Sequence, residues 1–419
     1  MQRLLVLGAG TAGTMVANKL RRRLSHDAWE IVVVDPSPVH IYQPGLLFVP
    51  FGRYEPDDLV KPSRPLLASG VSLKEDEVDH VDVAEGTVHL TSGVSVRYDQ
   101  LVIATGTHPR PDMTPGMNGP WFRKTVHEFY TMEGAAALRD ALESFDGGRL
   151  VVHVVEPPIK CPVAPLEFAF LADDHFRNRG IRDRVEIVYA TPLSGAFTKP
   201  IASERLGSML DERDIAVEPD FYVERVDEGA LVSYDERIVP FDLLVTVPLN
   251  MGADFVARSG LGDELNHVRV DPGTFLAQGC SNVFAVGDAA ALPISKAGSV
   301  AHFAVDVFVE NFLDHIAGRP MDRTFDGHAN CFVESGHGKA LLIDFNYDTE
   351  PLPGSYPVPG IGPLRLLKET RLNHLGKLAF RPIYWHLLLP GRRLPVPNAM
   401  SMAGKHQPSV NDDREETTR

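Results

Sequence analysis

Met-Gln-Arg-Leu-Leu-Val-Leu-Gly-Ala-Gly-Thr-Ala-Gly-Thr, residues 1–14, is the stretch that decides the fold of this chain. The apolar run at residues 4–7 predicts a short buried strand, and residues 15–22 predict a helix. The turn between them has the pattern Gly-x-Gly-x-x-Gly, formed by Gly8, Gly10 and Gly13. Such glycines allow a tight bend, the approach of a pyrophosphate, and close helix–strand packing. The stretch therefore predicts a dinucleotide site.

An acidic residue after the next predicted strand supports this prediction. Residues 30–34 form a second apolar run, and Asp35 ends it at about the 20-residue offset expected for a carboxylate that binds a ribose. We expect Thr11 and Ala12, within the glycine turn, to contact the ligand. Pro44, in a loop rich in proline and aromatic residues, is expected near it. A glycine-rich turn without a ligand is the alternative.

Length, charge and composition exclude several classes of protein. A chain of 419 residues suggests two or three domains, and 44% hydrophobic with 23% charged residues is ordinary for a soluble globular protein. The net charge of −15 argues against a nucleic-acid partner. No apolar run of about 18 residues predicts a membrane-spanning helix. The N-terminus enters a strand directly, so we expect no signal peptide.

An internal duplication indicates the architecture. A β-hairpin pattern precedes Tyr-Asp-Gln-Leu-Val-Ile-Ala-Thr-Gly at residues 98–106, and a second one precedes Phe-Asp-Leu-Leu-Val-Thr-Val-Pro at residues 241–248. We predict an α/β fold with two Rossmann-like domains in tandem, each with a hairpin insert. The predicted boundaries are a first domain at 1–115 and 272–323, a second at 116–271, a C-terminal region at 324–400, and a disordered tail at 401–419.

Two further motifs carry a family resemblance. Ala104-Thr105-Gly106 and Val286-Gly287-Asp288, with the glycine turn, resemble the FAD signatures of flavoproteins with two dinucleotide-binding domains. Within that superfamily the chain is similar, essentially end to end, to the sulfide:quinone oxidoreductases. The resemblance rests on three segments: Lys160-Cys161-Pro-x-Ala-Pro165, the stretch around Asn330-Cys331-Phe332, and His374-Leu-Gly-Lys377-Leu-Ala-Phe380.

The resemblance implies FAD as the cofactor. The glycine turn would hold its pyrophosphate, Asp35 its ribose, and Asp288 its ribityl chain. Lys296, at the start of a predicted helix over 297–315, would raise the electron affinity of the flavin together with the positive end of that helix. A solvated lysine is the alternative. No cysteine precedes Cys161, so a cysteine tether nearer the N-terminus is absent and we expect noncovalent FAD.

The second domain lacks a glycine motif. Its predicted first strand, residues 150–156, is followed by Pro157-Pro-Ile-Lys-Cys161-Pro162. Prolines remove backbone donors, so a pyrophosphate could hardly bind this turn. We interpret the second nucleotide site as lost, which argues against an NADH dehydrogenase.

Cys161 and Cys331 are the candidate catalytic cysteines. Three cysteines are too few for a disulfide scaffold and favour free thiols or a redox-active pair. Lys160 and a following helix N-terminus are expected to lower the pKa of Cys161. The resemblance implies that sulfide attacks a disulfide or trisulfide between the two cysteines. A persulfide then adds to the flavin or passes it two electrons, and polysulfide leaves.

Other assignments around the cysteines stay open. Each cysteine could instead be a small buried hydrophobic residue, which is the favoured interpretation for Cys280. Glu167 is the candidate general base for sulfide deprotonation, with a surface glutamate as the alternative. The sequence does not choose among the histidines that could assist, which are His40, His127, His302 and His337. No cluster has metal-ligand spacing, so we expect no metal.

The C-terminal segment 364–393 is basic and apolar. It carries seven lysines and arginines and one acidic residue, and Pro382 is expected to divide it into two short helices. This composition is typical of an amphipathic element on anionic lipid. We predict a peripheral protein on the surface of the cell inner membrane, with Phe332 and Phe380 on either side of a quinone ring and Lys377 close by. Packing on its own domain or on another subunit, in a homo-oligomer, is the alternative.

The sequence thus predicts a flavoprotein that oxidises sulfide to polysulfide or sulfur and reduces a quinone. The alternatives are the flavin subunit of a sulfide dehydrogenase that donates to a cytochrome, a type II NADH:quinone oxidoreductase, and an FAD-binding redox sensor without turnover. Tyr384 and Trp385 are expected at the lipid interface. The quinone type, the length of the sulfur product and the side of the membrane are not predicted.

Overall fold

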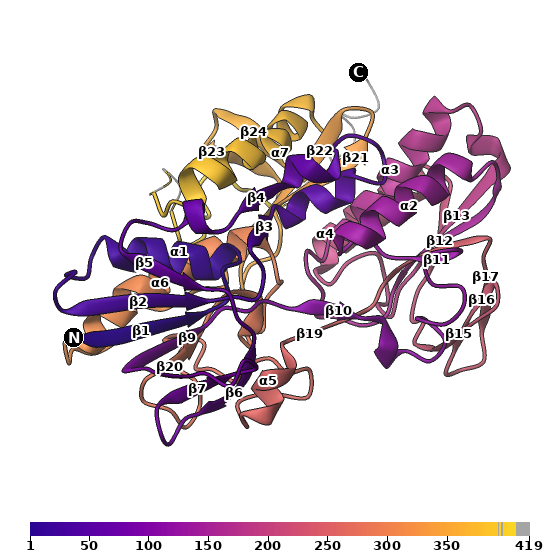
Figure 1. Cartoon of the computed structure of the whole chain (residues 1–419). Coiled ribbons are helices and arrows are strands. Elements are labelled where there is room, and N and C mark those ends of the chain that lie inside the picture. Colours follow the sequence, from indigo (N-terminus) through magenta and orange to yellow (C-terminus); the bar gives the residue numbers. More distant parts are fainter. Residues whose placement is uncertain (393, 395–396, 408–419) are drawn as a thin grey trace.

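The computed structural model describes residues 1–392, 394 and 397–407 and contains two parallel sheets and one mixed sheet (Figure 1). The first domain, which contains the N-terminus, lies at the left of the view, and the second lies at the right. The C-terminal region, coloured orange to yellow, lies along the top between them. Within the described residues, no helix has both the length and the apolar character needed to cross a membrane.

The first domain is built on a five-stranded parallel sheet in the order β20-β9-β1-β2-β5. Its strands are β1 (Gln2–Leu7), β2 (Trp29–Val34), β5 (Val71–Lys74), β9 (Gln100–Ile103) and β20 (Val283–Ala285). Strand β1 carries the apolar run at residues 4–7, and this run has no polar alternation because both faces of the strand are buried. Helices α1 (Thr11–Arg21) and α6 (Gly298–Ile316) pack on one face. The other face meets a three-stranded sheet of β6 (Val78–Asp82), β7 (Thr87–Leu90) and β8 (Ser95–Arg97).

The second domain repeats this plan. Its parallel sheet has the order β11-β18-β12-β13-β14. The strands are β11 (Val126–His127), β12 (Gly148–Val154), β13 (Val185–Ala190), β14 (Ile215–Glu218) and β18 (Leu243–Val247), and the helices are α2 (Met132–Ser144), α3 (Ala164–Asn178) and α4 (Pro200–Asp211). The inserted sheet contains β15 (Val223–Asp227), β16 (Ala230–Ser233) and β17 (Ile238–Pro240). The predicted duplication is therefore present, but each insert is a three-stranded sheet instead of a hairpin.

The predicted end of the second domain at residue 271 is wrong. The chain crosses between the domains in the antiparallel pair β10 (His108–Arg110) and β19 (Leu249–Met251). After β19, helix α5 (Asp254–Arg258) packs on β6, and residues such as Val268 join the core of the first domain. The segment from 254 to 271 consists of short turns and one short helix, so its sequence has no periodicity that would assign it to either domain.

A mixed four-stranded sheet in the order β21-β22-β24-β23 forms the C-terminal region. It consists of β21 (Ala329–Gly336), β22 (Lys339–Phe345), β23 (Gly354–Val358) and β24 (Gly362–Leu366), and helix α7 (Arg371–Ile383) packs on β21 and β22. The predicted basic segment therefore begins in a strand. Pro382 does not divide it, because α7 continues directly into a π-helical turn at Tyr384–Leu388. Such a wider turn is a common local irregularity of helices.

Ordered structure continues beyond the predicted start of the tail at Ser401. The backbone N–H of Ser355, on β23, donates to the carbonyl oxygen of Gly404 at 3.0 Å. The ammonium of Lys405 lies 2.6 Å from the buried carboxylate of Asp344. Residues 401–407 are therefore packed against the C-terminal sheet. The remainder of the predicted tail, residues 408–419, lies outside the described residues.

Candidate active site

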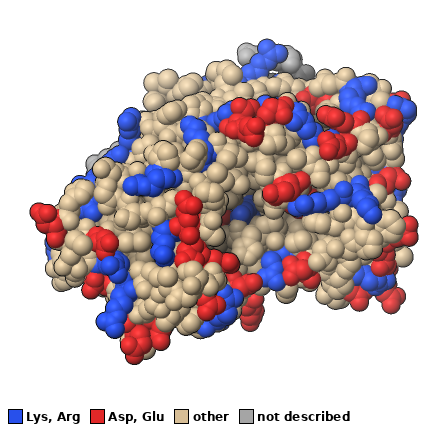
Figure 2. Space-filling view, viewed as in Figure 1, with Lys and Arg blue, Asp and Glu red and all other residues tan. Residues whose placement is uncertain are grey.

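A cavity lies where the two domains and the C-terminal region meet, and Figure 2 shows a hollow near the middle of this face. Most of the predicted cofactor residues line it. They are Gly10, Thr11, Ala12, Pro44, Ala104, Thr105, Gly106, Gly287, Asp288 and Lys296. The catalytic candidates Cys161 and Glu167 also line it, as do Lys377 and Phe380 from α7. Gly8, Gly13 and Asp35 do not line the cavity. They lie behind the glycine turn and hold its backbone in place.

The glycine turn is shaped to leave room for a ligand. Gly8 has φ +101°, and a Cβ at Gly13 would lie 1.9 Å from the carbonyl oxygen of Gly8, so these two glycines allow α1 to pack on β1. A Cβ at Gly10 would meet nothing within 4 Å, because this residue faces the cavity. One carboxylate oxygen of Asp35 accepts a 2.6 Å hydrogen bond from the backbone N–H of Ala9 and thereby braces the turn. These features fit a bound dinucleotide.

Substitutions at two of these glycines are expected to separate folding from binding. Gly10→Ala should fold normally, but its methyl group enters the space for the pyrophosphate and should weaken flavin binding by about tenfold or more. Gly13→Ala should lower the free energy of unfolding by about 1–3 kcal/mol, because the backbone of Gly8 blocks the methyl group. Thermal unfolding and flavin content of both variants measure this. Equal destabilisation by the two substitutions would contradict the assignment.

Cys161 reaches the cavity through a strained turn between β12 and α3. It is a non-glycine residue with φ +49°, a conformation that costs energy and is often found at functional sites. Its backbone N–H donates to the carbonyl oxygen of Lys296 at 2.7 Å, which fastens this turn to the first domain. The ammonium of Lys160 does not face the thiol group, since it donates to the side chain of Gln43 at 3.1 Å.

A buried ion pair lies beside Cys161. The ammonium of Lys377 is 2.6 Å from one oxygen of Glu167, and the other oxygen is 4.0 Å from the sulfur of Cys161. The backbone N–H of Glu334 also donates to Glu167, at 2.8 Å. Burial raises the pKa of Glu167, and Lys377 opposes this effect. Glu167 is fully buried, so the alternative of a surface glutamate is wrong.

Burial disfavours the thiolate form of both candidate cysteines, contrary to the prediction for Cys161. Burial raises the pKa of Cys161 far above its usual range, and the charge of Glu167 adds to the effect. Burial also raises the pKa of Cys331 to about 12. Lys377 opposes the shift in both thiols. The sequence predicted a lowered pKa from Lys160, but that ammonium binds elsewhere and desolvation is the largest effect.

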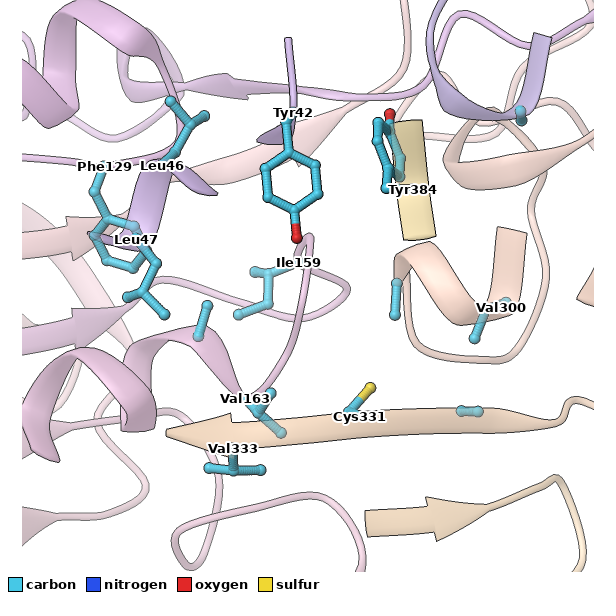
Figure 3. Packing of buried hydrophobic residues seen from close by; sticks show 14 of the residues in the cluster. Tyr42, Leu46, Leu47, Phe129, Ile159, Val163, Val300, Cys331, Val333 and Tyr384 are labelled. Carbon is cyan, nitrogen blue, oxygen red and sulfur yellow. The ribbon is translucent and has the colours of Figure 1, made fainter. Parts of the chain in front are cut away.

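Cys331 approaches the same region from β21. In Figure 3 its sulfur points from the strand towards the side on which Val163 and Tyr384 lie. Strand β21 packs on α3, and the ammonium of Lys377 donates to the carbonyl oxygen of Phe332, the residue after Cys331, at 3.1 Å. Cys280 instead packs against the core between the parallel sheet of the first domain and the β6–β7–β8 sheet, as expected for a structural cysteine.

Lys296 is a buried part of the site. Its ammonium donates to the carbonyl oxygens of Asp288 at 2.8 Å and Ala290 at 3.1 Å. Helix α6 begins two residues later, at Gly298, and its N-cap residue provides no side-chain hydrogen bond. The alternative of a solvated lysine is therefore wrong. The positive end of α6 lies at the cavity, where a negative charge is stabilised.

The aromatic residues differ most from the predictions. Phe380 lines the cavity, but Phe332 does not, and its ring packs against Gly376 of α7, where a Cβ would lie 2.8 Å from it. Tyr384 and Trp385 are buried, with exposures of 1% and 6%, so their predicted place at a lipid interface is wrong. Hydrophobic pattern alone could not separate a lipid contact from packing on the first domain.

Two tyrosines that line the cavity were not predicted to lie there. Tyr130 has a buried hydroxyl group without a partner among the described residues, and Tyr384 donates or accepts hydrogen bonds across the cavity wall. Neither tyrosine belongs to a motif with a mechanism. Of the four candidate histidines, His40 contacts Tyr384, and no histidine is among the described residues that line the cavity.

Comparisons with known proteins show the family of this chain. A family model described as pyridine nucleotide-disulphide oxidoreductase matches residues 2–307. The chain is similar to a mitochondrial sulfide:quinone oxidoreductase of Mus musculus, at 26% identity over 92% of this chain and 86% of that protein. It is similar to the protein of the same name in Dictyostelium discoideum, at 27% identity over 93% of this chain and 86% of that protein.

A solved structure shares the fold. The sulfide:quinone oxidoreductase from Aquifex aeolicus superposes with a TM-score of 0.80 at 20% sequence identity, covering 94% of this chain and 92% of that chain. The common fold thus includes the C-terminal region as well as the two Rossmann-like domains.

Proposed function

Because this chain belongs to the pyridine nucleotide-disulphide oxidoreductase family, we propose that it is an FAD-dependent sulfide:quinone oxidoreductase. The names of its relatives support sulfide as the electron donor and a quinone as the acceptor. The single observation that carries the proposal is the placement of Cys161 beside the Glu167–Lys377 ion pair at the cavity, with Cys331 on strand β21, whose Phe332 carbonyl oxygen accepts from the same lysine.

FAD would lie along the lined cavity. Its pyrophosphate would meet the glycine turn, Asp35 would support the ribose end, and Lys296 with the N-terminus of α6 would face the flavin. When bound, FAD would supply the two-electron chemistry that couples the oxidation of sulfide to the reduction of a quinone. The absence of a cysteine before Cys161 supports noncovalent binding, because none is available for a thioether there.

The protein groups would handle protons and sulfur. In the oxidised protein, Cys161 and Cys331 would share a disulfide. Hydrogen sulfide loses a proton as its sulfur bonds to one sulfur of this disulfide, which leaves a persulfide on one cysteine and frees the other as a thiol. When the persulfide and the freed thiol join in a new bridge that is one sulfur longer, two electrons and two protons are released, and the quinone takes up both. Glu167 lies 4.0 Å from Cys161, so it is placed to accept the proton, and Lys377 stabilises its charge.

The quinone would enter from lipid at the side of α7. Lys377 and Phe380 line the cavity there. Exposed apolar side chains lie on the tip of the β23–β24 hairpin, on α7, which packs on β24, and on the segment after Ser401, which bonds to β23. We call them the apolar face, which consists of Val358, Ile361, Leu372, Leu375 and Met402. Single exposed apolar residues are common, but a group of five on adjacent elements supports a membrane contact.

Membrane binding should depend on the apolar face. The double variant Ile361→Asp/Leu375→Asp is expected to bind liposomes of anionic lipid about 100-fold more weakly, since each fully buried side chain contributes about 1.5–3 kcal/mol. Cosedimentation with liposomes measures this. Ile238→Asp is the matched control, because Ile238 is 65% exposed in the second domain and should leave binding unchanged. Equal binding by the double variant would contradict the proposed membrane contact.

Flavin spectroscopy tests the proposed reaction. Sulfide should bleach the oxidised flavin of the anaerobic holoprotein, and a quinone should restore the absorbance. NADH should have no effect, because the turn that ends at Cys161 has no glycine. Bleaching by NADH but not by sulfide would overturn the proposal in favour of an NADH dehydrogenase. Reoxidation by a cytochrome but not by a quinone would instead favour a sulfide dehydrogenase subunit.

A further inference from the structure

The segment after α7 is fastened along the whole length of helix α1. Tyr384 bonds to Thr11 at the start of α1, with 2.7 Å between the two hydroxyl oxygens. The side-chain amide of Asn18 donates to the carbonyl oxygen of Leu389 at 2.7 Å. At the other end, Arg22 donates to the carbonyl oxygen of Gly391 at 2.9 Å. We call residues 384–391 the C-terminal clamp.

The hydrogen bonds of Tyr384 have a defined direction. The carbonyl oxygen of Ala9 can only accept, so Nδ1 of His40, 2.9 Å away, carries the proton. Burial lowers the pKa of His40 to about 4, which leaves the ring neutral near pH 7. Its Nε2 therefore accepts from the Tyr384 hydroxyl at 2.6 Å. The oxygen of Tyr384 in turn accepts from the Thr11 hydroxyl.

This chain of hydrogen bonds begins and ends in the glycine turn. Thr11 and Ala9 belong to the turn, while Tyr384 comes from the far end of the chain. Thr11 and Tyr384 both line the cavity. Figure 3 shows the side chain of Tyr384 beside that of Tyr42. The ring centroids of these two tyrosines are 5.0 Å apart. Helix α1 has Gly10 as its N-cap and no side-chain hydrogen bond there, so the turn has no capping side chain of its own.

We propose that the C-terminal clamp, through Tyr384, holds the glycine turn in the conformation that binds FAD and thereby retains a cofactor that has no covalent tether. A turn held in its binding conformation before the ligand arrives loses less conformational entropy on binding. This inference rests on the proposed flavin site. It also implies reciprocity, because a clamp that favours FAD binding must itself be stabilised by FAD.

Tyr384→Phe tests the clamp, because it removes the hydroxyl group and keeps the ring. We expect the dissociation constant for FAD to rise about tenfold, which corresponds to about 1.4 kcal/mol. Titration of the flavin-free full-length protein, followed by flavin fluorescence, measures it. The matched control is Tyr189→Phe, which breaks a buried tyrosine–threonine hydrogen bond to Thr191 in the second domain and should change the constant less than twofold.

Thr11→Val gives a second, independent variant of similar shape. It should weaken FAD binding by a similar factor, and the double variant with Tyr384→Phe should lose less than the product of the two factors, because both remove the same hydrogen bond. In the unmodified protein, removal of FAD should speed hydrogen exchange of residues 384–391 more than that of α4. Unchanged FAD affinity in both single variants would overturn the inference. Hydrogen exchange of the C-terminal clamp that stays the same when FAD is removed would also overturn it.

These measurements do not depend on the reaction. A protein that binds FAD through the clamp but is not bleached by sulfide would refute the proposed function and leave the clamp intact. Sulfide bleaching in a Tyr384→Phe protein with unchanged FAD affinity would do the reverse.

Discussion

Serine at position 161 or at position 331 is expected to slow sulfide-dependent flavin reduction by about 1,000-fold or more. The reaction proposed here passes through a sulfur bridge between Cys161 and Cys331, and a hydroxyl group can neither form that bridge nor carry a persulfide. Losing one member of a catalytic group that acts as a unit is known to cost several orders of magnitude. Stopped-flow bleaching of the anaerobic flavin by sulfide measures the effect.

The cysteine variants need a control of the same chemistry. Cys280→Ser removes the third thiol, which packs in the core between the first parallel sheet and the β6–β7–β8 sheet. The rate of sulfide-dependent flavin reduction in this variant should stay within about twofold of the wild-type rate. Flavin content should be similar in all three variants, because neither catalytic cysteine belongs to the glycine turn. Unchanged bleaching in both Cys161→Ser and Cys331→Ser would remove the cysteine mechanism while leaving a flavoprotein.

The sequence predicted which cofactor candidates gather at one cavity, because the information for their positions is local. The glycine turn, Asp35 and the Gly287-Asp288 turn each adjoin a buried strand of one parallel sheet, and the ends of such strands meet at one edge. Lining of the cavity by Thr11 and Lys296 follows from this arrangement. Spacing along the chain was therefore enough to predict which residues would gather there.

The sulfur and quinone half was predicted less well because it depends on packing between distant segments. The pKa of Cys161 depends on Glu167 and Lys377, which are 210 positions apart, and on burial that no local pattern reveals. Tyr384 is of a residue type that is common at lipid interfaces, yet its hydroxyl group forms a hydrogen bond with Thr11, 373 positions away in the sequence. Strand β24, at the start of the basic segment, was not predicted, because the charged residues around it gave the whole segment the pattern of an amphipathic helix.

Substitutions in the Glu167–Lys377 pair should shift the titration of Cys161 in opposite directions. A carboxylate near a thiol disfavours the thiolate, so Glu167→Gln should lower the pKa of Cys161. An ammonium favours the thiolate, so Lys377→Met should raise it further. Alkylation of the reduced protein by iodoacetamide across a range of pH, followed for each cysteine by mass spectrometry, reports the direction. Lys377→Arg keeps the charge and serves as the control.

In Glu167→Gln, the rate of flavin bleaching by sulfide and the rate of Cys161 alkylation should change in opposite directions. If Glu167 is the general base, its loss should slow sulfide-dependent bleaching by about 100-fold or more, even though Cys161 becomes easier to alkylate. A residue that only tuned the thiol electrostatically would give faster bleaching together with faster alkylation. Lys377→Met also leaves a buried carboxylate without its partner, which costs about 3–5 kcal/mol of folding stability. The double variant removes both charges, so it should recover part of that stability while bleaching stays slow, and this combination separates the chemical role of Glu167 from its structural one.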